Sequence, residues 1–334
     1  MRLAASLPVP PDLPACQRAA RRMEELGYDS VWIADTGAGP DAFVVATAVA
    51  CVTTRLRIGT AVIPAYTRTP SVFAGSAGAV AQLAPGRFVL GIGASSETIV
   101  RGWGGVPFER PLAYMREATT VIRQMLAGDR VTFEGKWLRT RGFRLVAHPP
   151  RPVPIYLAAL MPPMLELAGE LADGVILNMM PVDAVPRMLA HVRRGAERAG
   201  RDPKTLEVVA RFQVIVTDDA ASARGAVRHM LGPYFATSVY NRFAAWCGFE
   251  REAREILAGW QAKDRVRNLA AVTDDMIDRI AIIGTADECR RRLRAFHEAG
   301  VTTPMVHPFL FDEAAITAVL EGLAPGSQAA SPVL

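Results

Sequence analysis

Two neighbouring segments set the architecture of this chain: RLRIGTAVIPAYTRTP (residues 55–70) and PGRFVLGIGASSE (residues 85–97). Each begins as a short apolar strand and ends on small, turn-forming residues, and the Ala/Val-rich stretch between them has room for one helix. A strand, a helix and a second strand in this order form the repeating unit of a parallel sheet. In a closed barrel of such units the chemistry lies where strands end, because the loops there converge on one mouth. These two strand ends are therefore the first place to look for a site.

The same alternation continues over most of the 334 residues. The strand-like segments are residues 3–7, 30–34, 56–62, 87–91, 154–158, 174–178, 206–216 and 302–307. Eight strands with helices between them predict an α/β fold, a closed (β/α)8 TIM barrel. We expect this single domain to occupy residues 1–322, and residues 323–334 to form a disordered tail.

Two regions depart from this rhythm. Residues 130–148 are rich in β-forming residues around glycines and predict a β-hairpin insertion. Residues 221–283 are too long for one crossover and predict a helical insertion, in which Trp246, Phe249 and Trp260 are available for packing. A lid over the barrel mouth, an oligomer interface and ordinary core helices are all open interpretations of this second insertion.

Composition and charge exclude several classes of protein. Half of the residues are apolar, and the formal net charge of +5 comes from scattered Arg rather than from a basic face, so nucleic-acid binding is not expected. The longest apolar stretch, residues 42–52, is far shorter than the ~20 residues of a membrane helix. The first residues lack the apolar run of a secretory signal. The four cysteines lie far apart and favour neither disulfides nor a metal site. We expect a cytoplasmic protein.

Five longer motifs carry a resemblance to a known family. They are LGYDSVWIAD (residues 26–35), TRLRIGTAVIPAYTRTP (54–70), APGRFVLGIGAS (84–95), VPIYLAALMPPMLELAGELADGVILN (153–178) and GTADECRRRLRAFHEAGV (284–301). In order and spacing the chain resembles the bacterial luciferase-like superfamily. Within it, the chain is most similar to the branch that uses coenzyme F420, which includes methylenetetrahydromethanopterin reductase-like proteins.

The resemblance implies a cofactor site at the carboxyl end of the barrel. In the family an acidic residue after strand two lies near the cofactor ring, and a bulge with a non-proline cis peptide backs the ring at the end of strand three. The matching features here are Asp35 and the bond between Ala61 and Val62. A loop cap is the alternative for Asp35, and an ordinary buried strand end is the alternative for the bond. The residues that the resemblance places at the cofactor are Asp35, Ala61, Val62, Pro64, Gly93, Ala94, Ser95, Ser96, Ala158, Ala159, Leu160 and Met161.

The anionic tail of the cofactor is held, in this family, by the strand-five loop and the start of the next helix. Backbone amides and the helix dipole attract phosphate there. In this chain Pro162 and Pro163 supply no amide. The donors that remain for this role are the amides of Ala159, Leu160, Met161 and Met164.

Proton transfer is the least determined part of the site. The sugar-phosphate dehydrogenase subgroup uses a His after the strand-two Asp and a Glu in the strand-four loop, whereas the matching residues here are Thr36 and Ala94. Neither can transfer protons near neutral pH, so oxidation of glucose 6-phosphate by that pair is not expected. The protic residues left at strand ends are Asp35, Glu97, Asn178, Arg211 and His307. Asp35, Glu97 and His307 are the catalytic candidates. A hydrogen-bonded loop residue is the alternative for His307, whose ordinary pKa suits proton transfer.

Three functions fit these observations. The main hypothesis is an F420-dependent oxidoreductase that moves a hydride between the deazaflavin and a small organic substrate. The first alternative is an FMN-dependent two-component monooxygenase, which a flavin reductase partner supplies with reduced flavin. The second alternative is a non-catalytic barrel that binds a flavin or deazaflavin. A homodimer is expected, and no residue pattern names the substrate.

Overall fold

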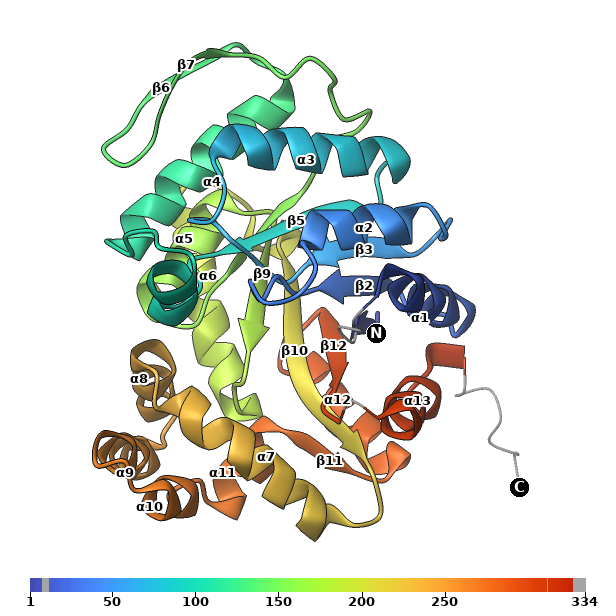
Figure 1. Cartoon of the computed structure of the whole chain (residues 1–334), viewed down its shortest axis with the longest axis vertical. Helices are drawn as coiled ribbons and strands as arrows, with labels where there is room; N and C mark the ends of the chain where they lie inside the picture. The colour runs from blue at the N-terminus through green and yellow to red at the C-terminus, as the bar shows by residue number, and fades with distance from the viewer. Residues whose placement is uncertain (8–11, 311, 327–334) are drawn as a thin grey trace.

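The computed structural model describes residues 1–7, 12–310 and 312–326, and it contains a closed parallel barrel (Figure 1). The barrel strands are β1 (Ala4–Ser6), β2 (Ser30–Ile33), β3 (Arg57–Thr60), β5 (Phe88–Gly93), β8 (Ile155–Ala158), β9 (Gly174–Asn178), β10 (Glu207–Val216) and β12 (Thr303–Pro308). They pair in the order β10-β12-β1-β2-β3-β5-β8-β9, and β9 pairs again with β10 to close the ring. The predicted TIM barrel and its eight strands are confirmed.

Helices surround the barrel (Figure 1). They are α1 (Leu13–Glu25), α2 (Ala42–Ala50), α3 (Pro70–Leu83), α4 (Pro111–Ala127), α5 (Pro162–Leu171), α6 (Val185–Arg198), α12 (Ala286–Glu298) and α13 (Glu313–Gly322). Local capping fixes where several of them start. Asp12 accepts a hydrogen bond from the Ala15 amide at the start of α1, and Thr285 and Glu288 form a reciprocal capping box at the start of α12.

Both predicted insertions are present. Residues 130–148 contain the antiparallel pair β6 (Val131–Glu134) and β7 (Arg139–Phe143). The helical insertion consists of α7 (Ala220–Phe235), α8 (Ser238–Trp246), α9 (Glu250–Gln261), α10 (Arg265–Ala270) and α11 (Asp274–Ile280). It leads into β11 (Ile282–Gly284), which pairs with the far end of β10. The insertion helices lie together on the side of the barrel that carries β10 and β11 (Figure 1).

The middle of the barrel is filled by apolar side chains. This interior layer comprises Ala4, Trp32, Val89, Tyr156, Ile176, Val209 and Met305. Trp32 is fully buried, and its ring takes the space in front of Gly59 on the neighbouring strand. A Cβ at Gly59 would lie 2.4 Å from that ring, so only glycine fits there. The layer separates the two ends of the barrel from each other.

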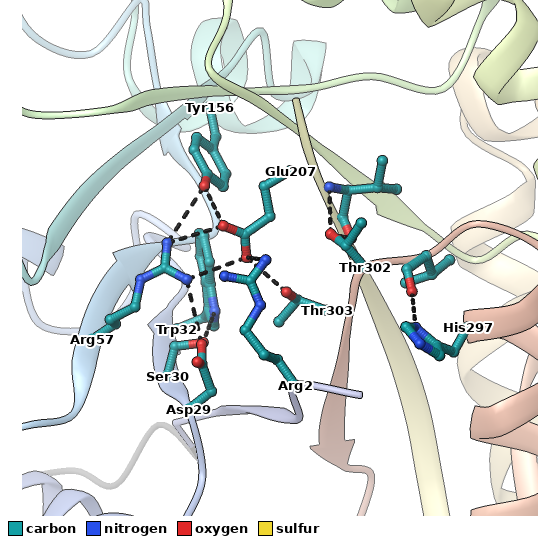
Figure 2. Close-up of polar contacts among 12 residues, drawn as sticks. Arg2, Asp29, Ser30, Trp32, Arg57, Tyr156, Glu207, His297, Thr302 and Thr303 are labelled. Atoms are coloured by element: carbon teal, nitrogen blue, oxygen red, sulfur yellow. Dashed lines mark hydrogen bonds and ion pairs between the residues drawn. The ribbon is translucent and has the colours of Figure 1, made fainter. Parts of the chain in front are cut away.

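The amino-terminal end of the barrel is closed by a polar network (Figure 2). The carboxylate of Glu207, at the start of β10, accepts hydrogen bonds from the hydroxyls of Tyr156 and Thr303, both at 2.6 Å. It also forms an ion pair with Arg57 at 3.1 Å, and Arg57 in turn reaches Asp29 at 3.3 Å. We call Glu207, Arg57, Tyr156 and Thr303 the base network. Because its buried charges are paired and hydrogen-bonded, it serves as the floor of the barrel.

The carboxyl-terminal segment differs in part from the expectation. Leu323 and Ala324, placed in the expected disordered tail, are buried against the rest of the molecule. The packed chain therefore extends beyond residue 322, because two further apolar side chains follow α13. Residues 327–334 lie outside the described residues. Within the described ranges, no helix combines the length and the apolar character that crossing a bilayer requires.

Candidate active site

The predicted third strand is interrupted by a bulge. The pairing with β5 runs from Gly59 opposite Val89 to Ile63 opposite Ile92, so one edge advances by four residues and the other by three. One extra residue in a strand is the definition of a β-bulge. The peptide bond between Ala61 and Val62 lies within it and is cis, as the resemblance implied. The strand then resumes as β4 (Ile63–Pro64).

The side chain of Thr60 holds the two strands together beside the bulge. Its hydroxyl donates to the carbonyl of Gly91 and accepts from the amide of the same residue, both at 2.8 Å. These bonds replace the backbone pairing that the bulge removes. The bulge is therefore a fixed part of the barrel mouth.

Small residues face one another across three neighbouring strands at the carboxyl end of the barrel. A Cβ placed on Gly93, the last residue of β5, would lie 2.8 Å from Val62 and 3.1 Å from Ala158. Ala61, Val62 and Ala158 also pack on the interior layer. We call Ala61, Val62, Gly93 and Ala158 the small-residue wall. It is a surface on which a flat ring can lie, and it brings together four of the residues expected at the cofactor.

The loop after β5 contributes backbone rather than acid–base chemistry. Ser95 has a left-handed φ of 67°, Ser96 begins the turn by accepting from the amide of Ile99, and a π-helix follows at Thr98–Trp103. Glu97 is 62% exposed and is paired with Arg101 four residues on, at 2.6 Å. The structure thus places Glu97 on the outer surface of the loop. It gives no support to Glu97 as a catalytic residue, because the turn directs this carboxylate to solvent.

The loop after β8 offers fewer free donors than expected. The amide of Ala159 donates to the carbonyl of Ile176, and the amide of Met164 donates to the carbonyl of Met161. Among the described residues, only the amides of Leu160 and Met161 remain without an acceptor out of the four that the sequence analysis named. These two donors precede α5, whose first turn has no side-chain cap. An anionic group can bind here through the two amides.

Asp35 is part of an ion pair beside the mouth. Its carboxylate accepts from Arg68 at 2.7 Å and from the amide of Gly37 at 3.3 Å. Arg68 also bonds Asp41, and it lies over the ring of Phe43. Burial alone would lower the pKa of Arg68, but Asp41 and Asp35 outweigh that effect and the pKa is raised. Asp35 therefore ties the loop after β2 to the loop after β4, as in the cap interpretation.

A second polar group lies at the mouth on the strands that follow β8 around the barrel. Each of β9, β10 and β12 contributes one residue to the interior layer, namely Ile176, Val209 and Met305. Asn178, Arg211 and His307 each lie two residues further along these strands and so point to the same interior side. Asn178 is directly opposite Arg211 in the strand register. We call Asn178, Arg211 and His307 the mouth cluster.

The mouth cluster is incomplete. The Nε of Arg211, the Oδ1 of Asn178 and the Nδ1 of His307 are buried polar atoms without a hydrogen-bond partner. No ion pair or hydrogen bond joins the guanidinium of Arg211 to any residue in the described part of the chain. Buried polar atoms are nearly always paired in folded proteins. Three such atoms on neighbouring strands make the mouth cluster a candidate binding site.

The surroundings of His307 disfavour the proton-transfer role expected for it. It is 7% exposed, and burial lowers the pKa of its imidazole to about 2, with a further contribution from the positive charge of Arg211. The ring is therefore neutral near pH 7 and offers hydrogen bonds rather than a titrating proton. The sequence did not show the burial or the neighbouring cation, and both disfavour the proton-transfer role that the ordinary pKa suggested.

The helical insertion contributes to the mouth. Tyr240 on α8 accepts a hydrogen bond from the Nδ2 of Asn178 at 3.1 Å, and its hydroxyl lies 3.5 Å from that of Tyr234 on α7. Burial raises the pKa of Tyr240 well above its usual value, so it stays protonated. Sequence reasoning missed both tyrosines, because the insertion matched no motif. Their only signal was a pair of Tyr residues six apart in an apolar helical region.

Comparison with known proteins settles the family. A family model described as luciferase-like monooxygenase matches residues 1–303, which is most of the chain. The chain belongs to the luciferase-like monooxygenase family. A 5,10-methylenetetrahydromethanopterin reductase of Methanolobus tindarius is 34% identical to this family member over 288 residues, which cover 85% of this chain and 86% of the relative.

Two further proteins extend this comparison. An F420-dependent glucose-6-phosphate dehydrogenase of Kineococcus radiotolerans is 35% identical over 221 residues, which cover 61% of this chain and 64% of the relative. The solved structure of a coenzyme F420-dependent tetrahydromethanopterin reductase from Methanopyrus kandleri superposes with a TM-score of 0.82 at 23% identity, covering 98% and 99% of the two chains. This luciferase-like chain therefore has the complete barrel of such proteins.

Proposed function

We propose that this chain is an oxidoreductase that uses coenzyme F420 to exchange a hydride with a small organic substrate. The relatives named for F420 chemistry support the cofactor, and the reductase of Methanolobus tindarius does so over most of both chains. The observation that carries the proposal is the small-residue wall beside the bulge. It provides a flat apolar face at the carboxyl end of the barrel, where the sites of such barrels lie.

The residues present fit the cofactor. A flat tricyclic ring needs side chains that do not project, and Gly93 and Ala158 meet Val62 with no room for a larger group between them. The anionic tail needs free donors, and the amides of Leu160 and Met161 have no acceptor among the described residues. When bound, the deazaflavin supplies hydride exchange at a ring carbon. The wall orients the ring, and the mouth cluster is left to face the substrate.

Proton control in this proposal falls to neutral groups. Asp35 is held by Arg68, Glu97 is exposed, and the pKa of His307 is lowered to about 2. No acid–base pair of the kind used by the sugar-phosphate dehydrogenase subgroup is present at Thr36 and Ala94. The chemistry that suits such a mouth is hydride transfer to or from a carbon whose neighbouring oxygen or nitrogen is hydrogen-bonded by the enzyme, while any proton that the product gains or loses is exchanged with water.

The test is a titration of the apoprotein with oxidised F420 and with FMN, followed by the fluorescence of each cofactor. We expect micromolar affinity for F420 and much weaker binding of FMN. The Gly93→Ala variant should bind F420 at least about tenfold more weakly, because the added methyl fills the wall between Val62 and Ala158. Tight FMN binding with no affinity for F420 would reject the proposal in favour of the monooxygenase alternative.

The matched control for this variant is Gly75→Ala. Gly75 is on α3, and a Cβ there would have no neighbour within 4 Å. Its affinity for F420 should equal that of the wild type. An equal loss in both variants would show that the effect at Gly93 is unspecific, and would remove the wall as the seat of the ring.

The finer expectations about assembly and location belong to the same proposal. A small molecule is the partner that the relatives support, and we propose that the protein acts as a cytoplasmic homodimer.

A further inference from the structure

Arg211 is a partly buried cation with no counter-charge among the described residues. Tyr234 and Tyr240 act on it electrostatically, Asn178 is opposite it in the strand register, and its charge acts on the neutral ring of His307. Arg57 and Arg68, the arginines at the base and beside the mouth, each have a carboxylate partner, in Glu207 and Asp35. An unpaired charge in a protein interior is costly, and such a group persists where a ligand completes it.

We propose that Arg211, with Asn178 and His307 beside it, binds a carboxylate of the substrate inside the barrel mouth. That the carboxylate belongs to the substrate rests on the proposed function, whereas the anion site itself rests only on the mouth cluster. The geometry agrees with a planar ligand, because a guanidinium presents parallel N–H donors that match the two oxygens of a carboxylate. The substrate class is therefore a small organic acid.

The charge of the cluster favours a monoanion. Arg211 is the single cation of the mouth cluster, since His307 is neutral and Asn178 carries no charge. A carboxylate balances one positive charge, whereas a dianionic phosphate would leave an excess negative charge in the same partly buried space. Balanced charge is the condition for stable burial of ions. Phosphate is thus the disfavoured anion at this position.

Asn178 can hydrogen-bond either the carboxylate of such a ligand or a hydroxyl or amine next to it. Its Nδ2 now donates to Tyr240, and its Oδ1 is free. In this orientation the free oxygen accepts from a hydroxyl or amine next to the carboxylate. Because the Tyr240 hydroxyl can also donate, the amide can instead be turned over, so that Nδ2 faces the carboxylate. In either orientation, every polar atom of the Asn178 side chain has a hydrogen-bond partner once the ligand is bound.

The position of the cluster assigns it to the substrate rather than to the cofactor ring. The small-residue wall is built on β3, β5 and β8, whereas Asn178, Arg211 and His307 come from β9, β10 and β12. A ring lying on the wall therefore has the mouth cluster beside it, on the strands that follow β8 around the barrel. A carboxylate held by Arg211 would anchor a substrate there, with its reacting carbon toward the ring.

The experiment measures binding of acetate and benzoate to the apoprotein by calorimetry, with acetamide and benzamide as neutral probes and inorganic phosphate as the competing anion. We expect saturable binding of at least one carboxylate, none of the amides, and weaker binding of phosphate. Arg211→Met should weaken carboxylate binding at least tenfold. The carboxylate affinity of Arg211→Lys should lie between those of the wild type and Arg211→Met, because lysine keeps the charge but lacks the planar guanidinium. The control Arg251→Met replaces an exposed arginine far along the chain and should bind as the wild type does.

Two further readouts separate a binding role from a structural one. Removing an unpaired charge should raise the Tm of Arg211→Met by about 2 °C, whereas a structural residue would lower it. Oxidised F420 should bind Arg211→Met as tightly as the wild type. Unchanged carboxylate affinity in Arg211→Met, tighter binding of phosphate than of carboxylates, or a tenfold loss of F420 affinity would each overturn the assignment. If carboxylates bind while F420 does not, the anion site stands and the proposed function fails.

Discussion

Strand β10 carries two buried charged residues, one whose partners the chain supplies and one whose partners it does not. At its start Glu207 enters the base network, where Arg57, Tyr156 and Thr303 satisfy the carboxylate. Four residues on, about 13 Å along the strand, Arg211 points to the same interior side, and no acceptor for it is present in residues 1–7, 12–310 and 312–326. The two ends are built from similar residue types in one barrel. The difference lies in whether the chain itself supplies the partners.

The base network and the mouth cluster differ in how their buried polar groups affect the stability of the fold. Burial alone would raise the pKa of Glu207, but the hydrogen bonds from Arg57, Thr303 and Tyr156 outweigh it and the pKa is lowered. In the mouth cluster the order is reversed, because burial lowers the pKa of Arg211 and of His307, and the opposing effect of Tyr234 and Tyr240 on Arg211 does not outweigh it. The base network therefore stabilises the fold, and the mouth cluster reduces its stability in exchange for a binding surface.

The largest expected effect comes from breaking the base network. Glu207→Gln keeps the shape of the side chain but removes the charge that balances Arg57, and Glu207 is only 9% exposed. Removing one partner of a buried ion pair leaves the other uncompensated, so we expect a loss of about 3 kcal/mol in the free energy of unfolding. Urea unfolding followed by circular dichroism measures it. Glu25→Gln, in an exposed pair with Arg22, should cost less than about 0.5 kcal/mol. Equal losses in the two variants would show that the base network is not a structural unit.

Most of the fold could be predicted because it depends on local patterns. Apolar runs of strand length alternating with amphipathic helices placed all eight barrel strands, and the turn-rich segment near 130–148 gave the hairpin. The break in the third strand could not be read from its letters, since Ala61 and Val62 are ordinary strand residues. It came from the resemblance alone. The order of Leu323 and Ala324 was missed because their burial depends on what lies beneath them.

The sequence predicts which residues lie at the mouth when their position follows from where a strand ends. It does not predict the direction or protonation of a side chain, because these depend on packing. Gly93 and Ala158 end their strands, so any barrel with these strands brings them to the mouth. The direction of Glu97 depends on a loop conformation, and the neutral state of His307 depends on burial and on Arg211. Tyr240 reaches Asn178 from 62 residues away in the chain, a contact that no local pattern encodes.

The next largest effect is the loss of folding stability at low pH that we expect from His307. Its pKa falls from 6.5 in the unfolded chain to about 2 in the fold, so the unfolded state takes up the proton first as the pH drops. The contribution of this residue to stability is therefore lost progressively below about pH 6.5, at up to about 1.4 kcal/mol per pH unit. Between pH 6.5 and 4.5 the wild type should lose about 2 kcal/mol that His307→Gln does not lose.

Urea unfolding at a series of pH values measures this difference. His229→Gln is the matched control, because His229 is exposed on α7 and its loss should leave the pH dependence unchanged. Parallel curves for the wild type and His307→Gln would mean that His307 is protonated in the fold as readily as outside it. In that case the mouth cluster would not be shielded from water, and its contrast with the base network would be lost.

The smallest effect tests whether the base network acts as one unit. Thr303 is fully buried and donates to Glu207 at 2.6 Å, so Thr303→Val should cost about 1.5 kcal/mol, the range for a hydrogen bond to a charged group. Thr120→Val, at an exposed site on α4, should cost less than about 0.5 kcal/mol. In Glu207→Gln the charge that strengthens this bond is gone, so the two substitutions together should cost at least about 0.5 kcal/mol less than their sum. Strict additivity would mean that Thr303 contributes only its own packing, and the floor of the barrel would then be a set of separate contacts rather than a network built around one carboxylate.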